Sequence, residues 1–314
     1  MNTPTPAAAR NPLQAHSDVL ATIVEQVGAS TLAVPGRHGA LASAVVWRPG
    51  LVVTAAHVFR RTPAAVSFVG SEGRTFAATL VGIDSSTDIA LFRFADEAAV
   101  DAPTAISVGD ASAVKAGHFA IAVGRSGEGD AIASAGLVNR AAGPWQTWLG
   151  GHVDRLIRLD GGVYDGLSGA AVADAAGAVI GIATAALSRS YGIVVPSSTV
   201  DRVVAALVAH GHAARPWLGI GAQPVPLPAS TAAVAGQIGL LVTSLAPGGP
   251  AERAGVLVGD IVVGAGDGRI GNLHELRQAL AAHVGKAATL SMLRGGVATE
   301  LMVQVGEWPG ARRC

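Results

Sequence analysis

Short apolar runs, each ended by turn-forming residues, fill the chain between Ser30 and Val195 and constrain its fold most strongly. Apolar runs of four to eight residues between Gly, Pro or Asp are typical of short β-strands. The 41 glycines and the aromatic content of only 4% suit many tight turns better than long helices. The sequence therefore predicts a mainly β protein of barrels or sandwiches. The clearest runs are residues 44–47, 51–54, 89–94, 119–123 and 179–183.

Other segments of the chain show helical spacing or none. The stretch 101–112 contains Pro103, has little periodicity and divides the strand-rich region into two β-units of similar length. Residues 210–216 follow a helical segment and read as a hinge before a compact region of about 90 residues. We expect helices at 18–27 (cap Ser17, stop Gly28), 198–210 (cap Ser197 or Ser198, stop Gly211) and 273–284 (Asn272 and Glu275 in capping-box spacing, stop Gly285).

The charge balance and the cysteine count exclude several classes of function. Lys plus Arg and Asp plus Glu each total 22, so the chain has no basic surplus for nucleic acid. The single cysteine, Cys314, allows no intrachain disulfide and no cysteine-based zinc site. The other histidines do not stand with carboxylates at metal-ligand spacing. We therefore expect no metal, no cofactor and no nucleic-acid partner.

Neither a membrane span nor an export signal is visible. The sequence has no stretch of ~18 consecutive apolar residues. Residues 1–10 contain Pro4 and Pro6 where a signal peptide would need a basic start and an unbroken apolar stretch. This favours a cytoplasmic location, or a periplasmic one if a leader is missing from the chain.

Three residues in the order His, Asp, Ser stand in contexts that suit nucleophilic catalysis. His57 follows an apolar run, Asp88 precedes another, and Ser168 lies between Leu167 and Gly169. A serine hydroxyl needs a base within reach, and the base needs a carboxylate that fixes its tautomer. Gly166 permits the sharp turn that aims the amides of Gly166 and Ser168 at an oxyanion. Each residue alone is weak evidence, and their joint order makes the catalytic interpretation the stronger one.

At these residues the chain resembles the trypsin-like serine proteases, and more narrowly the HtrA (DegP/DegS-like) family. The resemblance extends over about residues 18–307. It implies a chymotrypsin-like double β-barrel followed by a small α+β PDZ domain, with His57, Asp88 and Ser168 in the cleft between the barrels. The motifs that carry it are Val52-Val53-Thr54-Ala55-Ala56-His57-Val58, Thr87-Asp88-Ile89-Ala90-Leu91, Val114-Lys115-Ala116-Gly117, Ala122-Val123-Gly124, Gly166-Leu167-Ser168-Gly169, Val179-Ile180-Gly181-Ile182, Trp217-Leu218-Gly219-Ile220, Gly249-Pro250-Ala251-Glu252-Arg253-Ala254-Gly255 and Val258-Gly259-Asp260-Ile261-Val262.

The resemblance also implies partners and domain limits. A PDZ domain binds an extended peptide as an added strand, and Trp217, Leu218, Gly219 and Ile220 are the expected carboxylate loop for peptide C-termini. Unfolded polypeptides are the implied substrates, and a homotrimer is implied by kinship. The expected parts are a flexible tail at 1–17, the protease domain at 18–210, a linker at 211–216, the PDZ domain at 217–307 and a tail at 308–314.

Several positions differ from the family or superfamily pattern. Leu167 stands where digestive enzymes have a zymogen-pairing Asp, Gly162 where a trypsin-like specificity pocket has Asp, and Ala170 where the family has a second Gly. The family's Gly-Ser-Gly segment is here Ala42-Ser43-Ala44. Residues 182–186 and 193–195 are expected to border an apolar pocket, which predicts a small or medium aliphatic residue before the scissile bond.

Two other functions were weighed against the endopeptidase. The departures at Leu167 and Ala170 leave open a catalytically weak, PDZ-containing peptide-binding protein or chaperone on the same fold. An α/β-hydrolase esterase would have Ser before Asp before His, and the order His57, Asp88, Ser168 rejects it. A serine endopeptidase that acts on unfolded or damaged proteins is the primary prediction.

Overall fold

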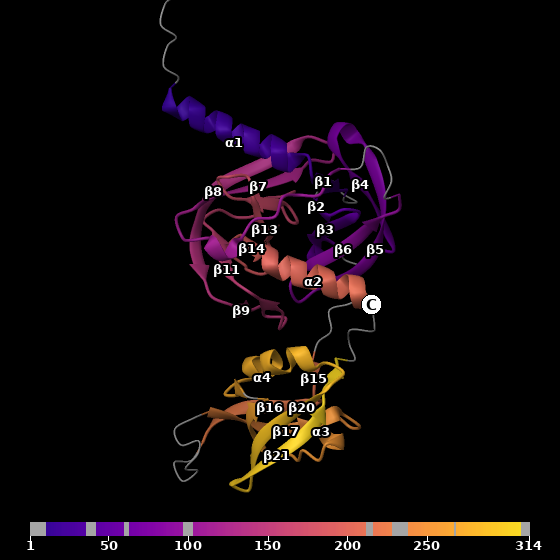
Figure 1. Cartoon of the computed structure of the whole chain (residues 1–314), viewed down its shortest axis with the longest axis vertical. Coiled ribbons are helices and arrows are strands. Elements are labelled where there is room, and N and C mark those ends of the chain that lie inside the picture. The colour runs from indigo at the N-terminus through magenta and orange to yellow at the C-terminus, as the bar shows by residue number, and fades with distance from the viewer. Residues whose placement is uncertain are drawn as a thin grey trace, which may run out of the picture. The chain divides into compact units, whose positions relative to one another are not determined.

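The structure is a computed structural model, and it describes residues 11–35, 42–59, 63–96, 103–211, 216–227, 238–266 and 268–308. The chain divides into two compact units, Met1–His212 and Ala213–Cys314. Figure 1 shows the first unit from indigo to salmon and the second from orange to yellow. Each unit is described by itself.

The first unit contains two closed β-barrels, each of six antiparallel strands. Strand order is β1-β2-β3-β6-β5-β4 in the first barrel and β11-β14-β13-β12-β7-β8 in the second. All five predicted apolar runs lie in strands, and residues 89–94 coincide with one of them. The strands are β1 Thr31–Val34, β2 Ala42–Arg48, β3 Leu51–Ala55, β4 Ala65–Val69, β5 Thr75–Asp84 and β6 Ile89–Phe94, then β7 Phe119–Arg125, β8 Ala131–Ala142, β11 Leu156–Leu159, β12 Ala171–Ala173, β13 Val179–Thr184 and β14 Ile193–Pro196.

The core of the first unit has three parts, because each barrel is filled and the two barrels also pack together. Phe68 and Phe92 fill the first barrel, where their rings meet edge to face. Val172 and Ile180 belong to the interior of the second. Between the barrels lies a third cluster that includes Trp47, and burial of such a side chain contributes about 1.5–3 kcal/mol. The two barrels are therefore held as one body.

Helix α2, Ser197–His210, packs on strands of both barrels. It begins at Ser197 without a side-chain cap, since the Ser197 hydroxyl donates instead to the carbonyl of Gly109 at 2.9 Å. Trp47 Nε1 donates to Asp201 Oδ1 on this helix at 2.8 Å. Gly211 ends the helix with a φ of 73°, a left-handed conformation that favours glycine. The predicted stop is thus confirmed, and the predicted cap is wrong.

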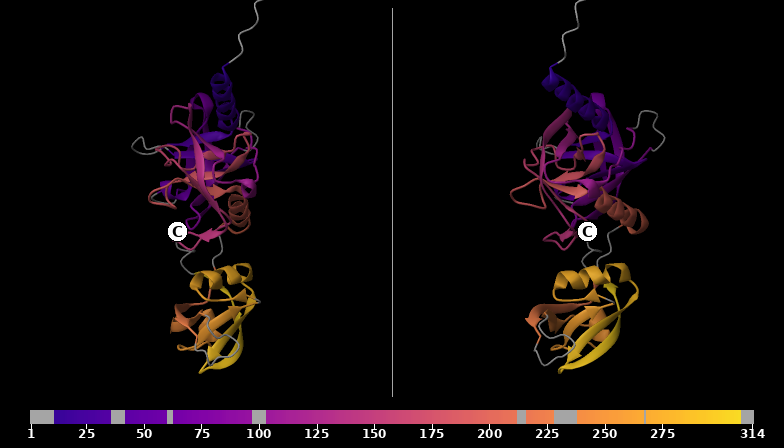
Figure 2. Two further views of the ribbon diagram at one scale, coloured as in Figure 1. Left: turned by 90° about the vertical axis from the view of Figure 1, so that its left-hand side faces the viewer. Right: turned by 60° about the vertical axis from the view of Figure 1, so that its left-hand side comes forward.

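Helix α1, Pro12–Gly28, starts earlier than the predicted helix. Its N-cap is Asn11, whose side chain accepts from the Leu13 amide at 3.0 Å, and Ser17 lies inside the helix. The Asn-Pro pair is a strong start signal, but the first turns are exposed, so apolar periodicity does not reveal them. Gly28 is the last helical residue and not the stop. Figure 2 shows the N-terminal part of α1 projecting beyond the barrels, and the helix contacts β7, β8 and β12.

The second unit is an antiparallel sheet with two helices. The sheet order is β16-β17-β18-β20-β21, so β16 and β21 are edge strands, and α4 lies beside β15 and β16. The elements are β15 Pro216–Trp217, β16 Ile220–Pro226, β17 Ile238–Leu245, α3 Pro250–Arg253, β18 Ile261–Ala265, β19 Gly268–Arg269, α4 Leu273–Leu280, β20 Ala287–Arg294, β21 Val297–Gln304 and β22 Gly306–Glu307. Two further short strands, β9 Trp145–Gln146 and β10 His152–Val153, form a hairpin in the first unit.

Helix α4 is shorter than predicted, because residues 281–283 tighten into a 3-10 turn. Asn272 caps it as expected and accepts from the Glu275 amide at 2.9 Å. The Glu275 carboxylate accepts from the Gly271 amide at 2.6 Å and not from that of Asn272, so the predicted reciprocal capping box is wrong in its second bond.

An ion pair between a buried carboxylate and a partly exposed guanidinium stabilises the second unit. Arg294 on β20 donates to both carboxylate oxygens of Asp260, at 2.9 and 2.7 Å, and the Leu257 amide donates to the same carboxylate at 2.8 Å. Asp260 is only 2% exposed. The hydrogen bonds from Arg294 hold the pKa of the Asp260 carboxyl below its ordinary value, against the opposing effect of burial.

Replacing Asp260→Asn is expected to lower the free energy of unfolding of this unit by about 2 kcal/mol at pH 7, since charge-assisted bonds are lost. The folded pKa lies below the unfolded value of about 3.9, so the contribution of the carboxylate is complete above that value and is lost as pH falls through the folded pKa. Urea unfolding followed by tryptophan fluorescence should show a difference at pH 7 that shrinks in acid. An equal difference at pH 7 and pH 3 would contradict this assignment.

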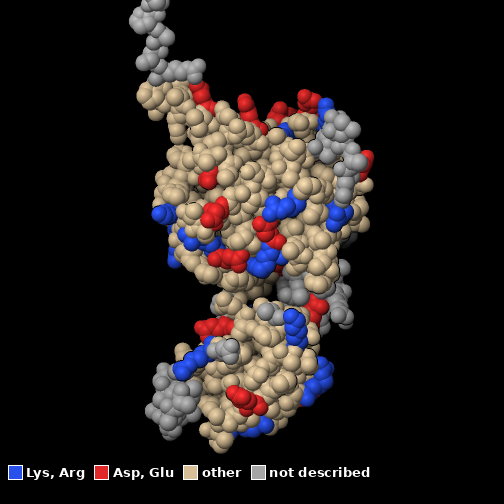
Figure 3. All heavy atoms as spheres, viewed as in Figure 1, with Lys and Arg blue, Asp and Glu red and all other residues tan. Residues whose placement is uncertain are grey.

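Charges of both signs are mixed on the face of the molecule that Figure 3 shows. On the face shown in Figure 3, basic and acidic side chains are interspersed on both units, in line with the equal totals of 22. Among the helices that the structure describes, none is both long and apolar enough to cross a bilayer.

Candidate active site

His57 lies at the point where the first barrel ends its third strand. β3 stops at Ala55, and residues Ala56–Val58 form a short 3-10 turn that carries the imidazole. The His57 amide and Nδ1 contact the two carboxylate oxygens of Asp88, at 2.8 and 2.7 Å respectively. With the Nδ1 proton donated to the carboxylate, Nε2 is left as a proton acceptor.

Asp88 is held in place from both barrels. It is buried, and its φ of 62° is a left-handed conformation that Asp adopts more readily than most residues. The hydroxyl of Thr184, at the end of β13 in the second barrel, donates to Asp88 Oδ2 at 2.5 Å. Thr184 was not predicted from the sequence. Its only local signal is a hydroxyl at the end of an otherwise apolar strand.

The turn that presents Asp88 is built by a second buried carboxylate. Asp84 Oδ1 accepts from the amide and the hydroxyl of Ser86, at 3.0 and 2.5 Å, and Asp84 Oδ2 accepts from the Thr87 hydroxyl at 2.8 Å. These bonds close the turn between β5 and β6 and keep the polar groups satisfied where water is excluded. Local bonds therefore close the turn that carries Asp88, while its carbonyl accepts from the Ala56 amide at 3.1 Å and its side chain is held by long-range bonds.

Ser168 lies on a loop that packs against the same end of the first barrel. Its carbonyl accepts from the Ser43 amide on β2 at 2.8 Å, and the Gly169 amide donates to Ala183 at 2.8 Å. Gly169 has a φ of 84°, and a Cβ there would lie 2.1 Å from the Ser43 carbonyl oxygen and 2.6 Å from the Thr54 hydroxyl. The loop thus approaches the strand end that leads into His57. The side chains of His57 and Ser168 are both described, and they form no hydrogen bond with each other in this structure. Hydrogen bonds of this kind often tighten only when substrate binds.

Two backbone amides beside Ser168 are free to bind an anion. Within the described part of the chain, neither the Gly166 amide nor the Ser168 amide donates to a protein acceptor. Gly166 has a φ of 88°, in the left-handed region that favours glycine. Backbone amides left without an acceptor are what an oxyanion requires.

The two departures next to Ser168 are accommodated in the core of the second barrel. Leu167 is 4% exposed and Ala170 is 0% exposed, and both belong to that apolar cluster. The Ala170 amide donates to Leu167 at 3.1 Å, and the Ala170 carbonyl accepts from Ala183 at 2.9 Å. At the position of the zymogen-pairing Asp, this chain therefore has the buried apolar side chain of Leu167, which needs no charged partner.

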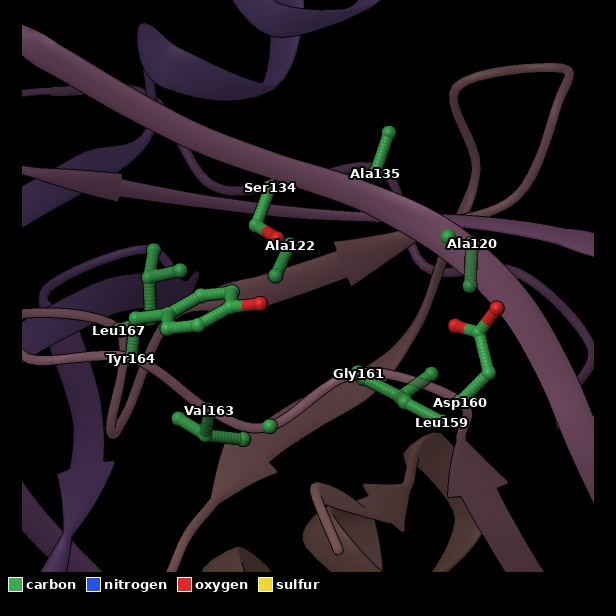
Figure 4. Close-up of a pocket in the computed structure, with 12 residues that line it drawn as sticks. Ala120, Ala122, Ser134, Ala135, Leu159, Asp160, Gly161, Val163, Tyr164 and Leu167 are labelled. Carbon is green, nitrogen blue, oxygen red and sulfur yellow. The ribbon is translucent and has the colours of Figure 1, made fainter.

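A small pocket of about 60 Å³ opens beside this loop, between β7, β8 and residues 159–167 (Figure 4). Ala120, Ala122, Leu159, Val163 and Leu167 give it a mainly apolar wall, and Asp160 and Tyr164 also line it.

The sequence had indicated residues 182–186 and 193–195 as the border of such a pocket, and none of them lines this one. Most of these residues are buried in paired strands: Ile182, Ala183, Ile193, Val194 and Val195. Among them only Ala185 and Ala186 retain exposure, and their place at the border of a specificity pocket stays a prediction.

Comparison with known proteins gives two matching family models. A trypsin-like peptidase domain matches residues 42–182, and a PDZ domain matches residues 241–294. The "Probable periplasmic serine endoprotease DegP-like" of Brucella suis biovar 1 is 32% identical over 282 residues, which cover 84% of this chain and 52% of that protein. This chain belongs to the HtrA family of trypsin-like serine proteases with a PDZ domain.

Other HtrA relatives agree with this assignment. The protein of the same name from Chlamydia trachomatis serovar D is 29% identical over 272 residues, covering 84% of this chain and 53% of its own length. The chain thus spans about half the length of the curated relatives it matches.

Solved HtrA structures confirm the fold. The "HtrA-type protease AlgW with decapeptide" has a TM-score of 0.77 at 23% identity and covers 92% of this chain and 98% of its own. A serine endoprotease from Yersinia pestis has a TM-score of 0.72 at 21% identity and covers 98% of this chain and 100% of its own. The mainly β prediction, with two barrels followed by a PDZ domain, is confirmed.

Proposed function

We propose that this HtrA-family chain is a serine endopeptidase in which Ser168 is the nucleophile, His57 the general base and Asp88 the group that orients His57. The observation that carries the proposal is the pair of hydrogen bonds between His57 and Asp88, at 2.8 Å from the His57 amide and 2.7 Å from Nδ1. The serine loop nearby has two amides that donate to no protein acceptor among the described residues. A purely structural histidine would not need a buried carboxylate on both its amide and its ring.

The reaction proceeds in two acyl-transfer steps. His57 Nε2 takes the Ser168 proton as Oγ attacks the scissile carbonyl, and the imidazolium that forms is stabilised by Asp88. The amides of Gly166 and Ser168 donate to the developing oxyanion. His57 then protonates the leaving amine, and water hydrolyses the acyl-enzyme by the same route in reverse.

For the substrate, we propose that the pocket at Leu167, the residue before Ser168, takes a small aliphatic residue before the scissile bond. Its mainly apolar wall offers a methyl or isopropyl group a dry contact, and Gly162 supplies no carboxylate at the position where a trypsin-like pocket has Asp. The Asp160 carboxylate, which also lines the pocket, accepts from the Leu137 amide at 3.0 Å. The volume of about 60 Å³ disfavours large aromatic side chains. One methylene shifts selectivity by only ~1–3 kcal/mol, so the preference is graded. Unfolded polypeptide is the proposed substrate, because an extended chain can reach the site.

Active-site labelling tests this function. A fluorophosphonate probe should label the wild type on Ser168, located by mass spectrometry, and casein should be cleaved mainly after Ala, Val or other small aliphatic residues. A folded wild type that neither labels nor cleaves would refute the endopeptidase and favour the catalytically weak peptide-binding alternative. Cleavage mainly after Lys, Arg or Phe would refute the proposed preference alone.

The second unit supports a peptide-binding role. β16 is an edge strand with α4 beside it, and an edge strand can accept an added peptide strand. Just before it, the amides of Leu218 and Gly219 donate to no protein acceptor within the described residues. The carbonyls of the same two residues are held by the amides of Ala251 and Ala246, at 2.9 and 2.7 Å. We propose that the free amides receive a peptide's terminal carboxylate, with Trp217 and Ile220 flanking them.

A C-terminal hydrophobic peptide should therefore bind at least ~10-fold more tightly as the free acid than as the amide, because charge-assisted hydrogen bonds are lost on amidation. Gly219→Ala should weaken the acid form, since Gly219 has a φ of 76° and a Cβ there would lie 3.2 Å from both Ala246 and Trp217. Gly285→Ala is the matched control, because Gly285 has the same φ of 76° with nothing within 4 Å of an added Cβ. Fluorescence polarisation measures both effects. Equal affinity for acid and amide would contradict the carboxylate loop.

A further inference from the structure

Ser43 is a fully buried polar residue with four hydrogen bonds, two of which reach the serine loop. It lies on β2 and is 0% exposed. Its amide donates to the Ser168 carbonyl at 2.8 Å, and its hydroxyl contacts the Gly166 carbonyl at 2.6 Å. The Arg125 amide reaches the same hydroxyl at 3.0 Å, and the Thr54 hydroxyl donates to the Ser43 carbonyl at 2.7 Å. The catalytic mechanism proposed above gives Ser43 no role.

The direction of the hydroxyl proton follows from these partners. A serine hydroxyl has one proton to donate and can accept others. The Arg125 amide can only donate, so Ser43 Oγ accepts from it. The proton of Ser43 Oγ is therefore directed to the Gly166 carbonyl, which can only accept. Both bonds lie in a buried site, where an unpaired group costs ~1–3 kcal/mol.

Strand β7 packs directly against the Ser43 hydroxyl. A Cβ on Gly124 would lie 2.1 Å from Ser43 Oγ, so the adjacent strand β7 approaches too closely for any larger residue. Arg125, which follows, is itself anchored: its buried guanidinium donates to the carbonyls of Thr31 at 2.7 Å, Gly129 at 2.5 Å and Gly28. The donor that orients Ser43 is thus part of a rigid framework.

The two bonds from Ser43 bracket one oxyanion donor. The Gly166 carbonyl belongs to the peptide group that precedes Leu167, and the Ser168 carbonyl to the peptide group that follows Ser168. Between them lies the peptide group whose N–H is the Ser168 amide. We propose that Ser43 is a positioning residue that fixes the orientation of the Ser168 amide by holding the peptide carbonyls of Gly166 and Ser168 on either side. This proposal rests on the proposed function, because an oxyanion hole matters only in an active enzyme.

Ser43→Ala tests the hydroxyl's part. Complete removal of one oxyanion donor costs on the order of 10²- to 10³-fold, and loss of its support should cost less. We expect kcat for a peptide substrate to fall about 10- to 100-fold, with KM little changed. The concentration of folded enzyme used to calculate kcat is counted by fluorophosphonate labelling carried to completion. The affinity of a peptide aldehyde, whose adduct carries the oxyanion, should fall by the same factor, and the pH profile should keep its shape. Ser43→Gly deletes the same hydroxyl and should behave alike.

Ser197→Ala is the matched control, because Ser197 is also buried and also donates to a backbone carbonyl, that of Gly109 at 2.9 Å, but on helix α2. It should keep wild-type kcat and aldehyde affinity. The positioning role is overturned, while the protease remains, if both Ser43 variants retain wild-type kcat. It is also overturned if kcat and KM of the Ser43 variants change together and the Ser197→Ala control loses as much thermal stability as they do. An inactive, folded wild type would instead overturn the proposed function, and this inference with it.

Discussion

Ser168→Ala should lower kcat for a peptide substrate on the order of 10⁶-fold, the size of the loss when the nucleophile of another serine protease is removed. Without Oγ no acyl-enzyme forms, and His57 has no proton to take. What remains is the transition-state stabilisation by the amides of Gly166 and Ser168, which alone sustains a small residual rate. Steady-state kinetics on a chromogenic peptide, together with loss of fluorophosphonate labelling, measures the effect.

The control for this variant is Ser197, which is buried, whereas Ser168 is partly exposed. Ser197→Ala should retain activity, because its hydroxyl bonds only to Gly109. Thermal unfolding should show that Ser168→Ala is folded, since Ser168 contributes its carbonyl and not its hydroxyl to the contact with Ser43. Retention of more than a few per cent of activity by Ser168→Ala would identify another nucleophile and contradict the proposed mechanism.

Asp88→Asn should lower kcat about 10⁴-fold, as the equivalent change does in a trypsin-like enzyme. Asp88 accepts three hydrogen bonds, from the His57 amide, His57 Nδ1 and Thr184 Oγ1. An asparagine has one acceptor oxygen and an amide group that only donates. If that group faces Nδ1, the imidazole must place its proton on Nε2, where it can no longer accept from Ser168.

The matched control is Asp174→Asn. Asp174 also accepts from backbone amides, those of Ala176 and Ala178 at 2.9 and 3.0 Å, in a turn before β13. Its kcat should stay within about twofold of wild type, because that turn carries none of the proposed catalytic groups. A loss of less than 10-fold in Asp88→Asn, with the fold intact, would show that Asp88 does not control the tautomer of His57.

Much of the fold could be predicted from local pattern. The five apolar runs lie in strands because their length, their burial and the turn residues around them all favour extended structure. Gly211 and Asn272 act as predicted at helix ends, since capping depends on the residue and its immediate neighbours. The cap of α2 at Ser197 was wrong because its hydroxyl bonds to Gly109, which is 88 residues away in the sequence.

The sequence by itself determined the β class, the two β-units, the order His57, Asp88, Ser168 and the glycine turn at Gly166. Only the tertiary structure showed that Thr184 bonds to Asp88, that Ser43 bonds to the serine loop, and that residues 182–183 and 193–195 are buried in the core. The physical reason is the distance along the chain. Thr184 and Asp88 are 96 residues apart, and Ser43 and Gly166 are 123 apart, so closure and packing of the barrels, and no local propensity, bring these groups within hydrogen-bond reach.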